Sequence, residues 1–548
     1  MKKNKLLKKG FWIFLLLLVV LAWIFGLFID LTGDSGLYAA ISRQMVESGN
    51  WLSLKINGEP YDQKPHLFFW LAGLGIKLFG NTNFAYKLFP FLFAVTGIYF
   101  TYRLGRVVHG ELAGKLAALI TATSQMFFLY LFDFHTDSVL YSCVILAIWQ
   151  LAEYLKNQKT SHFLLGFVGV GLAMLTKGPV GAVLPFLFVF FYLLLKMDFY
   201  QLFHPKWFAG ILLVLLIISP ALIHLWKNFG AAGIHFYFID NNLGRVSGKV
   251  AGSSVDPFFY LYNMLWAFLP WTIILISGIA GEIKRWFVAK AKNIAGIALL
   301  LSVFVLFLVY SVARGKAPNY VMMFIPLLSV VAAGTVQHYL LLPDFFGREM
   351  VYFQIPFLGL IGFMLFFIAL KIQQDAILVP ILIIAGILLF AGLFSIIEKN
   401  KWKKIFFLSV AVAVGFNLYL NIEVIPGLFT FQGYRQALQI FESQKLPGEQ
   451  LHNFELEEYA LFFYAKETVE NTGTWEQLHE AMEKPGTWLY TNETKYRDIR
   501  DMGFDIDTVY QIKQRGMNRI TYEFLNSSTR EHSLKVNYLI KTKSGHRQ

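Results

Sequence analysis

Long apolar runs, most of them near the length that crosses a bilayer, recur along most of the chain. The first, at about 11–29, follows five lysines within the first ten residues. Further runs lie at roughly 85–102, 114–131, 138–154, 162–176, 179–195, 207–225, 258–281, 295–313, 319–337, 351–370, 377–396 and 405–422. A helix needs about 20 apolar residues to cross the hydrocarbon core. The pattern therefore predicts about 13 transmembrane helices, and the shorter run 67–79 is expected to lie along the membrane interface.

The pattern changes beyond residue 425, where polar and apolar residues mix at shorter periods. Helical periodicity is present near 432–443 and 474–484. Strand-like alternation is present at 486–491, 507–513, 519–525 and 535–540. We therefore expect an α-helical polytopic membrane protein, with a transmembrane domain over 1–425 and a small C-terminal α/β domain over 426–548.

Composition agrees with a membrane protein and excludes several other classes. Hydrophobic residues make up 56% of the 548 residues and charged residues 15%, against about 45–50% and 25% in soluble domains. A single cysteine excludes a disulfide scaffold. The net charge of +13 comes from the apolar part, because residues 427–548 hold about 15 basic and 17 acidic side chains. Basic membrane loops explain this excess, and no nucleic acid is expected as a partner.

The distribution of charge also predicts an orientation. Lysines before the first span favour a cytoplasmic N-terminus. With that start, the inner loops hold about 21 basic residues and the outer loops about 10. An odd number of crossings then puts the α/β domain on the outer face. The long loop 31–66 lies on the same side, as the first outer loop.

The distinctive polar residues gather in these outer loops, whereas the predicted spans are almost free of charge. These polar residues come from five successive outer loops. The candidates for a functional site are Asp34, Lys64, Asp137, Lys177, Arg245, Lys316 and Tyr320. In a membrane protein such a set is a functional candidate, and we expect it to converge on one cavity at the outer boundary of the membrane.

The chemistry of this set suggests transfer to an acceptor from a phosphate-linked donor. Two carboxylates, Asp34 and Asp137, can orient or deprotonate an acceptor hydroxyl, or can hold a divalent cation. Lysine, arginine and tyrosine side chains can neutralise a phosphate, and they stabilise it most when charge grows on it as a leaving group. A phosphate bound at the membrane surface implies a lipid-linked donor.

Several motifs resemble the C-type membrane glycosyltransferases, which include the bacterial lipid A aminoarabinose transferases and the protein O-mannosyltransferases. The most specific is the block from Asp34 to Gly80, which contains "NGEPYDQKPH" at 57–66. Later blocks match in order: "GLAMLTKGP" at 171–179, "NNLGRVSG" at 241–248, "WAFLPW" at 266–271 and "KAPNYVMMFIP" at 316–326. The resemblance covers roughly 10–425, and such enzymes often carry an outer α/β domain after it.

The resemblance implies a function and a role for each candidate. It implies a multi-pass protein of the bacterial inner membrane that moves a sugar from a polyprenyl (undecaprenyl) phosphate donor to a cell-envelope acceptor such as lipid A, a glycan or a protein, on the periplasmic face. Asp34 and Asp137 match the catalytic carboxylates. The resemblance assigns binding of the donor phosphate to Lys64, Arg245 and Tyr320. Lys177 and Lys316 match further lysines of the family.

Two departures from the family bear on a metal. Ser35 stands where the family often has glutamate, and Gln63 replaces the glutamate before Lys-Pro. Both changes remove a potential metal ligand, so a divalent cation remains possible but its ligands are unassigned. The identities of the sugar and the acceptor are equally open, because a fold does not fix a substrate.

Other interpretations of the same residues exist. Asp34 could cap a helix over 35–47, and Asp137 could cap the span beginning at 138. His135 is expected to be structural. A transporter or flippase of lipid-linked sugars is the alternative function, but such a protein would place ionisable groups near the bilayer midplane.

Overall fold

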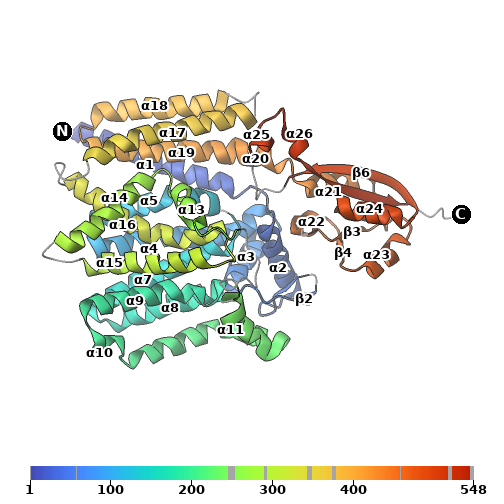
Figure 1. The fold of residues 1–548 in the computed structure, drawn as a ribbon, viewed down its shortest axis with the longest axis horizontal. Coiled ribbons are helices and arrows are strands. Elements are labelled where there is room, and N and C mark those ends of the chain that lie inside the picture. Colours follow the sequence, from blue (N-terminus) through green and yellow to red (C-terminus); the bar gives the residue numbers. More distant parts are fainter. Residues whose placement is uncertain are drawn as a thin grey trace.

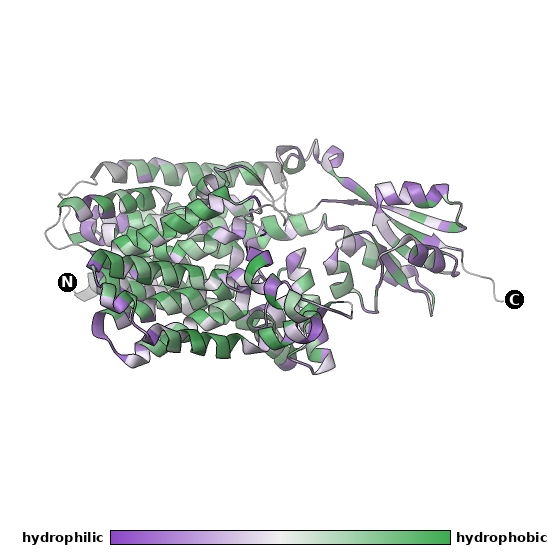
Figure 2. Cartoon of the chain, turned by 60° about the horizontal axis from the view of Figure 1, so that its bottom comes forward, coloured by the Kyte–Doolittle hydropathy of each residue, from purple (hydrophilic) through white to green (hydrophobic). Residues whose placement is uncertain are grey.

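The computed structural model is an elongated helical bundle with a mixed α/β domain at one end (Figure 1). It describes residues 2–543, except 57, 132, 243, 245–253, 289–292, 342–347, 373–377, 457 and 516–520. The N-terminus lies at the end of the bundle farthest from the α/β domain. The bundle is mostly apolar, whereas the α/β domain and the loops that face it are richer in polar residues (Figure 2).

Among the described residues, nine helical segments are long and apolar enough to cross a membrane, or ten if a bent pair counts as one. The nine are built on α1 (Lys2–Gly26), α4 (Asn83–His109), α7 (Thr136–Asn157), α8 (Thr160–Lys177), α11 (Lys206–His235), α15 (Ile294–Val312), α16 (Phe324–Leu341), α18 (Leu378–Ile397) and α19 (Lys401–Tyr419). The bent pair is α13 (Phe259–Ala267) with α14 (Thr272–Val288), which meet at 111°. The multi-pass helical fold predicted from the sequence is confirmed.

Among the described residues the number of full-length spans is smaller than the 13 predicted, although each predicted span is mostly helical. Helix α9 (Val180–Lys196) and the apolar part of α17 (Arg348–Ile372) are shorter than the others. The run 114–131 is divided into α5 (Glu111–Ala122) and α6 (Gln125–Tyr130). The break has a local cause, because the hydroxyls of Thr123 and Ser124 donate to the carbonyls of Leu119 (2.6 Å) and Thr121 (3.0 Å).

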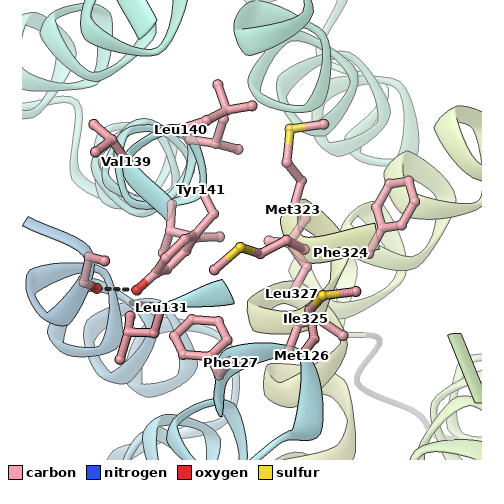
Figure 3. Packing of buried hydrophobic residues seen from close by; sticks show 14 of the residues in the cluster. Met126, Phe127, Leu131, Val139, Leu140, Tyr141, Met323, Phe324, Ile325 and Leu327 are labelled. Atoms are coloured by element: carbon pink, nitrogen blue, oxygen red, sulfur yellow. Dashed lines mark hydrogen bonds between the residues drawn. The ribbon is translucent and has the colours of Figure 1, made fainter. Parts of the chain in front are cut away.

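Two helices form the centre of the bundle. About nine-tenths of the apolar window is buried in the segment around α7 and in the one that contains α16, against 11% in α18. Figure 3 shows the packing between them, where Tyr141 of α7 lies among Met126, Phe127 and Met323. Tyr141 also donates a hydrogen bond to the carbonyl of Ala94 in α4. This core supports the ends of α7 and α8 that carry the polar candidates.

Residues from distant helices form hydrogen bonds at the bend between α13 and α14. The buried Gln354 of α17 donates to the carbonyl of Pro270 at 2.9 Å. The Trp271 indole donates to the hydroxyl of Thr123, in the break between α5 and α6, at 3.0 Å. The two interruptions are therefore joined to each other.

The segment between α1 and α4 lies between the bundle and the α/β domain (Figure 1). It contains α2 (Asp34–Ser48), the two-stranded hairpin of β1 (Lys55–Ile56) and β2 (Glu59–Pro60), and the short apolar helix α3 (Leu67–Phe79). Helix α3 has the bounds expected of the interfacial run. This segment carries Asp34 and Lys64 to the same end of the bundle.

The C-terminal domain is a five-stranded sheet in the order β4-β3-β5-β7-β6. The strands are β3 (Leu451–Phe454), β4 (Glu470–Thr472), β5 (Trp488–Asn492), β6 (Ile506–Gln514) and β7 (Lys535–Thr542). β3 runs parallel to β4 and β5, whereas β7 is antiparallel to β5 and β6. The helices are η4 (Leu420–Val424) and α20 (Ile425–Phe429) at the junction, then α21 (Gly433–Gln444), α22 (Tyr459–Tyr464), α23 (Trp475–Met482), α24 (Glu493–Asp501), α25 (Tyr522–Leu525) and α26 (Arg530–Ser533).

The predicted elements of this domain are largely present. Both predicted helices and three of the four predicted strands are found, as α21, α23, β5, β6 and β7. The strand predicted at 519–525 is wrong where the structure describes it, because Tyr522–Leu525 is a helical turn whose amide at Phe524 is capped by Thr521 (3.4 Å). Strands β3 and β4 were not predicted, since four or three residues are too few to give a clear alternation.

A polar cluster attaches the α/β domain to the bundle. Asp30, just after α1, accepts from the Tyr434 hydroxyl (2.9 Å), from Nε of Arg435 (2.7 Å) and from the Asn83 amide (3.0 Å). Asn83 in turn accepts from the hydroxyl of Tyr464 in α22 at 2.7 Å. Two of these five groups come from the bundle and three from the domain.

Close packing adds to this attachment at the helix that carries Asp34. A Cβ atom on Gly36 of α2 would lie 3.0 Å from the backbone nitrogen of Ala460 in α22. Only a residue without a side chain allows the two helices to approach this closely. The C-terminal domain thus bears directly on α2.

Candidate active site

Asp34 lies at the mouth of the site, in the first turn of α2. The N-cap of this helix is Gly33, so Asp34 is not the capping residue. Its side chain is 69% exposed, and its Oδ2 atom is 3.6 Å from Nε2 of His135. Hydrogen bonding to His135, with the neighbouring charges of Lys64 and Lys177, lowers the pKa of Asp34 despite its partial burial. Asp34 therefore offers an ionised carboxylate to a molecule that approaches from outside.

Asp137 lies deeper, near the start of α7, and is fully buried. Both of its oxygens accept from Nζ of Lys177, at 2.7 and 2.8 Å. Oδ2 also accepts from the Asn319 amide at 2.7 Å and is 2.6 Å from Nδ1 of His135. The N-cap of α7 is His135, so Asp137 is not a capping residue either. It is the buried counter-ion around which three polar side chains are organised.

His135 connects the two carboxylates, and the sequence analysis expected it to be structural. It is 12% exposed, and its ring meets the ring of Tyr38 edge-on with centroids 5.4 Å apart. Burial alone would lower the pKa of His135, but hydrogen bonding to Asp137 and Asp34 raises it to about 9. The sequence feature that could have indicated a functional role for His135 is the alternation Asp133-x-His135-x-Asp137, which places three ionisable groups at the start of an apolar helix.

Lys177 and Tyr320 face each other across the site. Nζ of Lys177 lies 4.6 Å from the centroid of the Tyr320 ring, a distance typical of a cation–π contact. The Tyr320 ring continues into an aromatic row, since its centroid is 5.5 Å from that of Tyr310, which is 5.6 Å from that of Tyr260. Lys177 therefore joins the buried carboxylate to an aromatic wall.

Lys316 differs in its surroundings. It is buried, and Nζ donates to the carbonyl of Ala313 at 2.5 Å. Gly315, beside it, contributes to the lining of the cavity described next. Arg245, the remaining sequence candidate, lies outside the described residues.

A cavity of about 460 Å³ opens beside Lys177. Its polar end is lined by Lys64, Lys177, Asn241, Asn242, Tyr260, Tyr310 and Tyr320. The rest is apolar and runs between α9 and α15, where it is lined by Val180, Val183, Phe186, Leu187, Val305, Leu306 and Val309. A compartment that is cationic at one end and apolar along its length suits an amphiphile with an anionic head group.

Buried histidines fix the loop that carries Lys64. Nε2 of His66 is 3.1 Å from the carbonyl oxygen of Leu52, and Nε2 of His224 is 2.9 Å from that of Tyr61. Burial lowers the pKa of His66 to about 4, so that it is neutral near pH 7. These contacts hold both ends of the segment that leads to Lys64.

The residues present do not form an evident metal site. Among the described residues, no three histidine, cysteine, aspartate or glutamate side chains converge in a way that could hold an ion. The two carboxylates contact the nitrogens of His135 and Lys177 instead. The hydroxyl of Ser35 donates to Oδ1 of Asp133 at 2.8 Å.

Comparisons with known proteins show what the chain is similar to in sequence and in fold. The family model described as dolichyl-phosphate-mannose-protein mannosyltransferase matches residues 63–224. An uncharacterized protein of Aquifex aeolicus is 26% identical over 443 residues, which cover 80% of this chain and 82% of that protein. Undecaprenyl phosphate-α-4-amino-4-deoxy-L-arabinose arabinosyl transferase 2 of Proteus mirabilis is 28% identical over 318 residues. That match covers 55% of this chain and about half of the relative, 54%.

A solved structure shares the whole fold. ArnT from Cupriavidus metallidurans, bound to undecaprenyl phosphate, superposes with a TM-score of 0.76 at 17% sequence identity. The superposition covers 97% of this chain and 98% of that one. The resemblance predicted from the motifs is therefore confirmed: the chain is similar to the protein mannosyltransferases over residues 63–224, to the aminoarabinose transferases in sequence, and to ArnT in its fold.

Proposed function

We propose that this protein transfers a sugar from a polyprenyl phosphate, such as undecaprenyl phosphate, to an acceptor of the cell envelope on the outer face of the inner membrane. The observation that carries the proposal is the cavity beside Lys177, which is cationic at one end and apolar along its length. It lies next to the carboxylates of Asp34 and Asp137. The acceptor is a lipid, a glycan or a protein.

The phosphate of the donor is assigned to the polar end of the cavity. Lys64 supplies positive charge there, and Lys177, whose charge is shared with Asp137, supplies an ammonium donor. Tyr260, Tyr310 and Tyr320 supply hydroxyls. Arg245 is proposed as a further phosphate ligand from the sequence resemblance alone. Several donors around one phosphate neutralise its charge, and this matters most where water is excluded.

The prenyl chain is assigned to the apolar slot between α9 and α15. Burying the chain against aliphatic and aromatic side chains would hold the donor without a polar contact. The slot is continuous with the phosphate end, so one molecule can occupy both parts. This fits a donor that enters sideways from the bilayer.

The transfer step follows from the positions of the acid groups. The acceptor oxygen attacks the anomeric carbon, the bond from that carbon to the phosphate oxygen breaks, and the prenyl phosphate leaves with the electron pair. Asp34, exposed at the mouth, orients the acceptor and takes its proton. A single displacement of this kind inverts the configuration at the anomeric carbon. Preorganised cations stabilise the charge that grows on the phosphate.

The first test measures binding of undecaprenyl phosphate to the purified protein. Lys64→Met and Tyr320→Phe should each weaken binding, because each removes a donor from the polar end of the cavity. Tyr99→Phe, at the opposite end of the bundle where Tyr99 contacts Arg103 (2.8 Å), is the control and should bind as the wild type does. Equal affinity in all four proteins would refute the assignment of the phosphate.

The second test looks for the product. Mass spectrometry of envelope lipids, glycans and proteins, with and without the gene, should find one class that loses a sugar mass. A strain with Asp34→Asn should match the strain without the gene, although the purified variant still binds undecaprenyl phosphate. Normal product from Asp34→Asn would remove Asp34 from the mechanism.

A further inference from the structure

His135 holds a position that the proposed mechanism does not yet use. Its two ring nitrogens point to different carboxylates, with Nδ1 at 2.6 Å from Asp137 and Nε2 at 3.6 Å from Asp34. The first carboxylate is buried and the second is exposed. The imidazole ring is thus a physical link between the core of the bundle and the mouth of the site.

The link requires a particular form of the ring. A neutral imidazole has only one N–H, so it can donate to one of the two carboxylates, whereas an imidazolium donates to both. The ionisable groups around the ring are the two carboxylates, Lys177 and the phenol of Tyr38, and Lys64 acts on Asp34. Two negative charges are then balanced by Lys177 and by the ring itself, so that the buried part of the site has no large net charge.

The inner end of the link is rigid and the outer end is not. Asp137 accepts from Lys177 through both oxygens and from Asn319, so its position is fixed by contacts with α8 and with η2 (Pro318–Met323). Tyr38, fully packed beneath the ring, limits its tilt. Asp34, by contrast, is 69% exposed and stands in the first turn of a helix. Its only ion-pair partner among the described residues is His135.

We propose that His135 is a positioning residue that anchors the exposed Asp34 to the buried Asp137 and so aims the Asp34 carboxylate at the acceptor. This inference rests on the proposed function, because it assigns Asp34 to the acceptor. His135 itself does not touch the donor phosphate in this scheme. It orients the carboxylate of Asp34 and stabilises its negative charge, as a residue that hydrogen-bonds a reacting group from behind commonly does.

The test uses His135→Gln, whose side-chain amide can donate to one carboxylate but cannot bridge two. The turnover number for sugar transfer should fall about 10- to 100-fold, the range seen when the orienting partner of a metal ligand is lost. The affinity for undecaprenyl phosphate should stay within twofold of the wild type, because the donor end of the cavity is unchanged. A fall in turnover without a fall in donor binding is not expected of a residue that only supports the fold.

His162→Gln is the matched control. His162 also hydrogen-bonds a side chain within the bundle, since its Nδ1 is 2.6 Å from Oε1 of Gln150, but it lies at the opposite end of α8 from Lys177. This variant should keep wild-type turnover. If His135→Gln does not fold, His135→Asn replaces it, because the shorter amide likewise cannot span the two carboxylates.

The outcomes separate this inference from the proposed function. If the wild type neither binds undecaprenyl phosphate nor yields product, the proposed function fails. If the wild type does both and His135→Gln has wild-type turnover, only the role of His135 is refuted. A parallel loss of donor affinity, turnover and thermal stability would also refute it, since that pattern marks a purely structural side chain.

Discussion

Replacing Lys177 with methionine should destabilise the bundle by a measurable amount. Asp137 is fully buried, and both of its carboxylate oxygens accept from the ammonium group of Lys177, at 2.7 and 2.8 Å. Removing one member of a buried ion pair typically costs about 3–5 kcal/mol, because the other charge is left uncompensated. His135 and Asn319 still contact Asp137 in the variant. We therefore expect the free energy of unfolding to fall by about 3 kcal/mol, the lower end of this range.

The measurement is the free energy of unfolding in mixed detergent micelles, for a complete double-mutant cycle. Asp137→Asn alone leaves the ammonium group buried without its partner and should also destabilise. The double variant removes both charges, so its loss should be smaller than the sum of the two single losses by about 1–3 kcal/mol.

A more exposed ion pair in the C-terminal domain provides the control. Nζ of Lys495 is 3.1 Å from Glu455, whose side chain is 42% exposed. Lys495→Met should change the free energy of unfolding by less than about 1 kcal/mol. Single variants at Lys177 and Asp137 that unfold like the wild type, or losses that simply add, would show that the pair does not hold the site together.

Further predictions concern the domain contact and pH. Gly36→Val should make the C-terminal domain more susceptible to limited proteolysis, because a Cβ there would lie 3.0 Å from the backbone of Ala460. Tyr464→Phe removes the hydrogen bond to Asn83 and should lower the free energy of unfolding by about 1–3 kcal/mol. The pKa of His135 is raised from 6.5 to about 9, so the stability due to its contacts is complete below about pH 6.5 and is lost as pH rises through 9. A titration of stability against pH should show this decline in the wild type and not in His135→Gln.

The sequence predicted the helical bundle well because hydropathy is a local property. The sequence analysis overestimated the number of full-length spans because an apolar run can contain a break in the helix, as at Thr123 and Ser124. Strands β3 and β4 were not predicted because they depend on pairing within the sheet, where β3 lies between β4 and β5, rather than on a pattern of their own.

The candidate site illustrates the same limit. Asp34, Asp137 and Lys177 were found from residue type and motif, but the pairing of Lys177 with Asp137 could not be predicted. His135 was expected to be structural, and its contact with Asp34, which belongs to another loop, could not be predicted either. Contacts between segments distant in sequence arise only when the chain folds, so they cannot be predicted from the pattern of a single sequence.

The bend between α13 and α14 has a consequence for biosynthesis. The carbonyl of Pro270 is satisfied by Gln354, which follows 84 residues later in the chain. Inside a bilayer no water can substitute for that donor. The carbonyl of Pro270 therefore lacks this hydrogen bond in the nascent chain until α17 has been synthesised and inserted. A substitution at Gln354 would therefore leave the carbonyl of Pro270 without this donor, although every segment that carries a candidate site residue is unchanged.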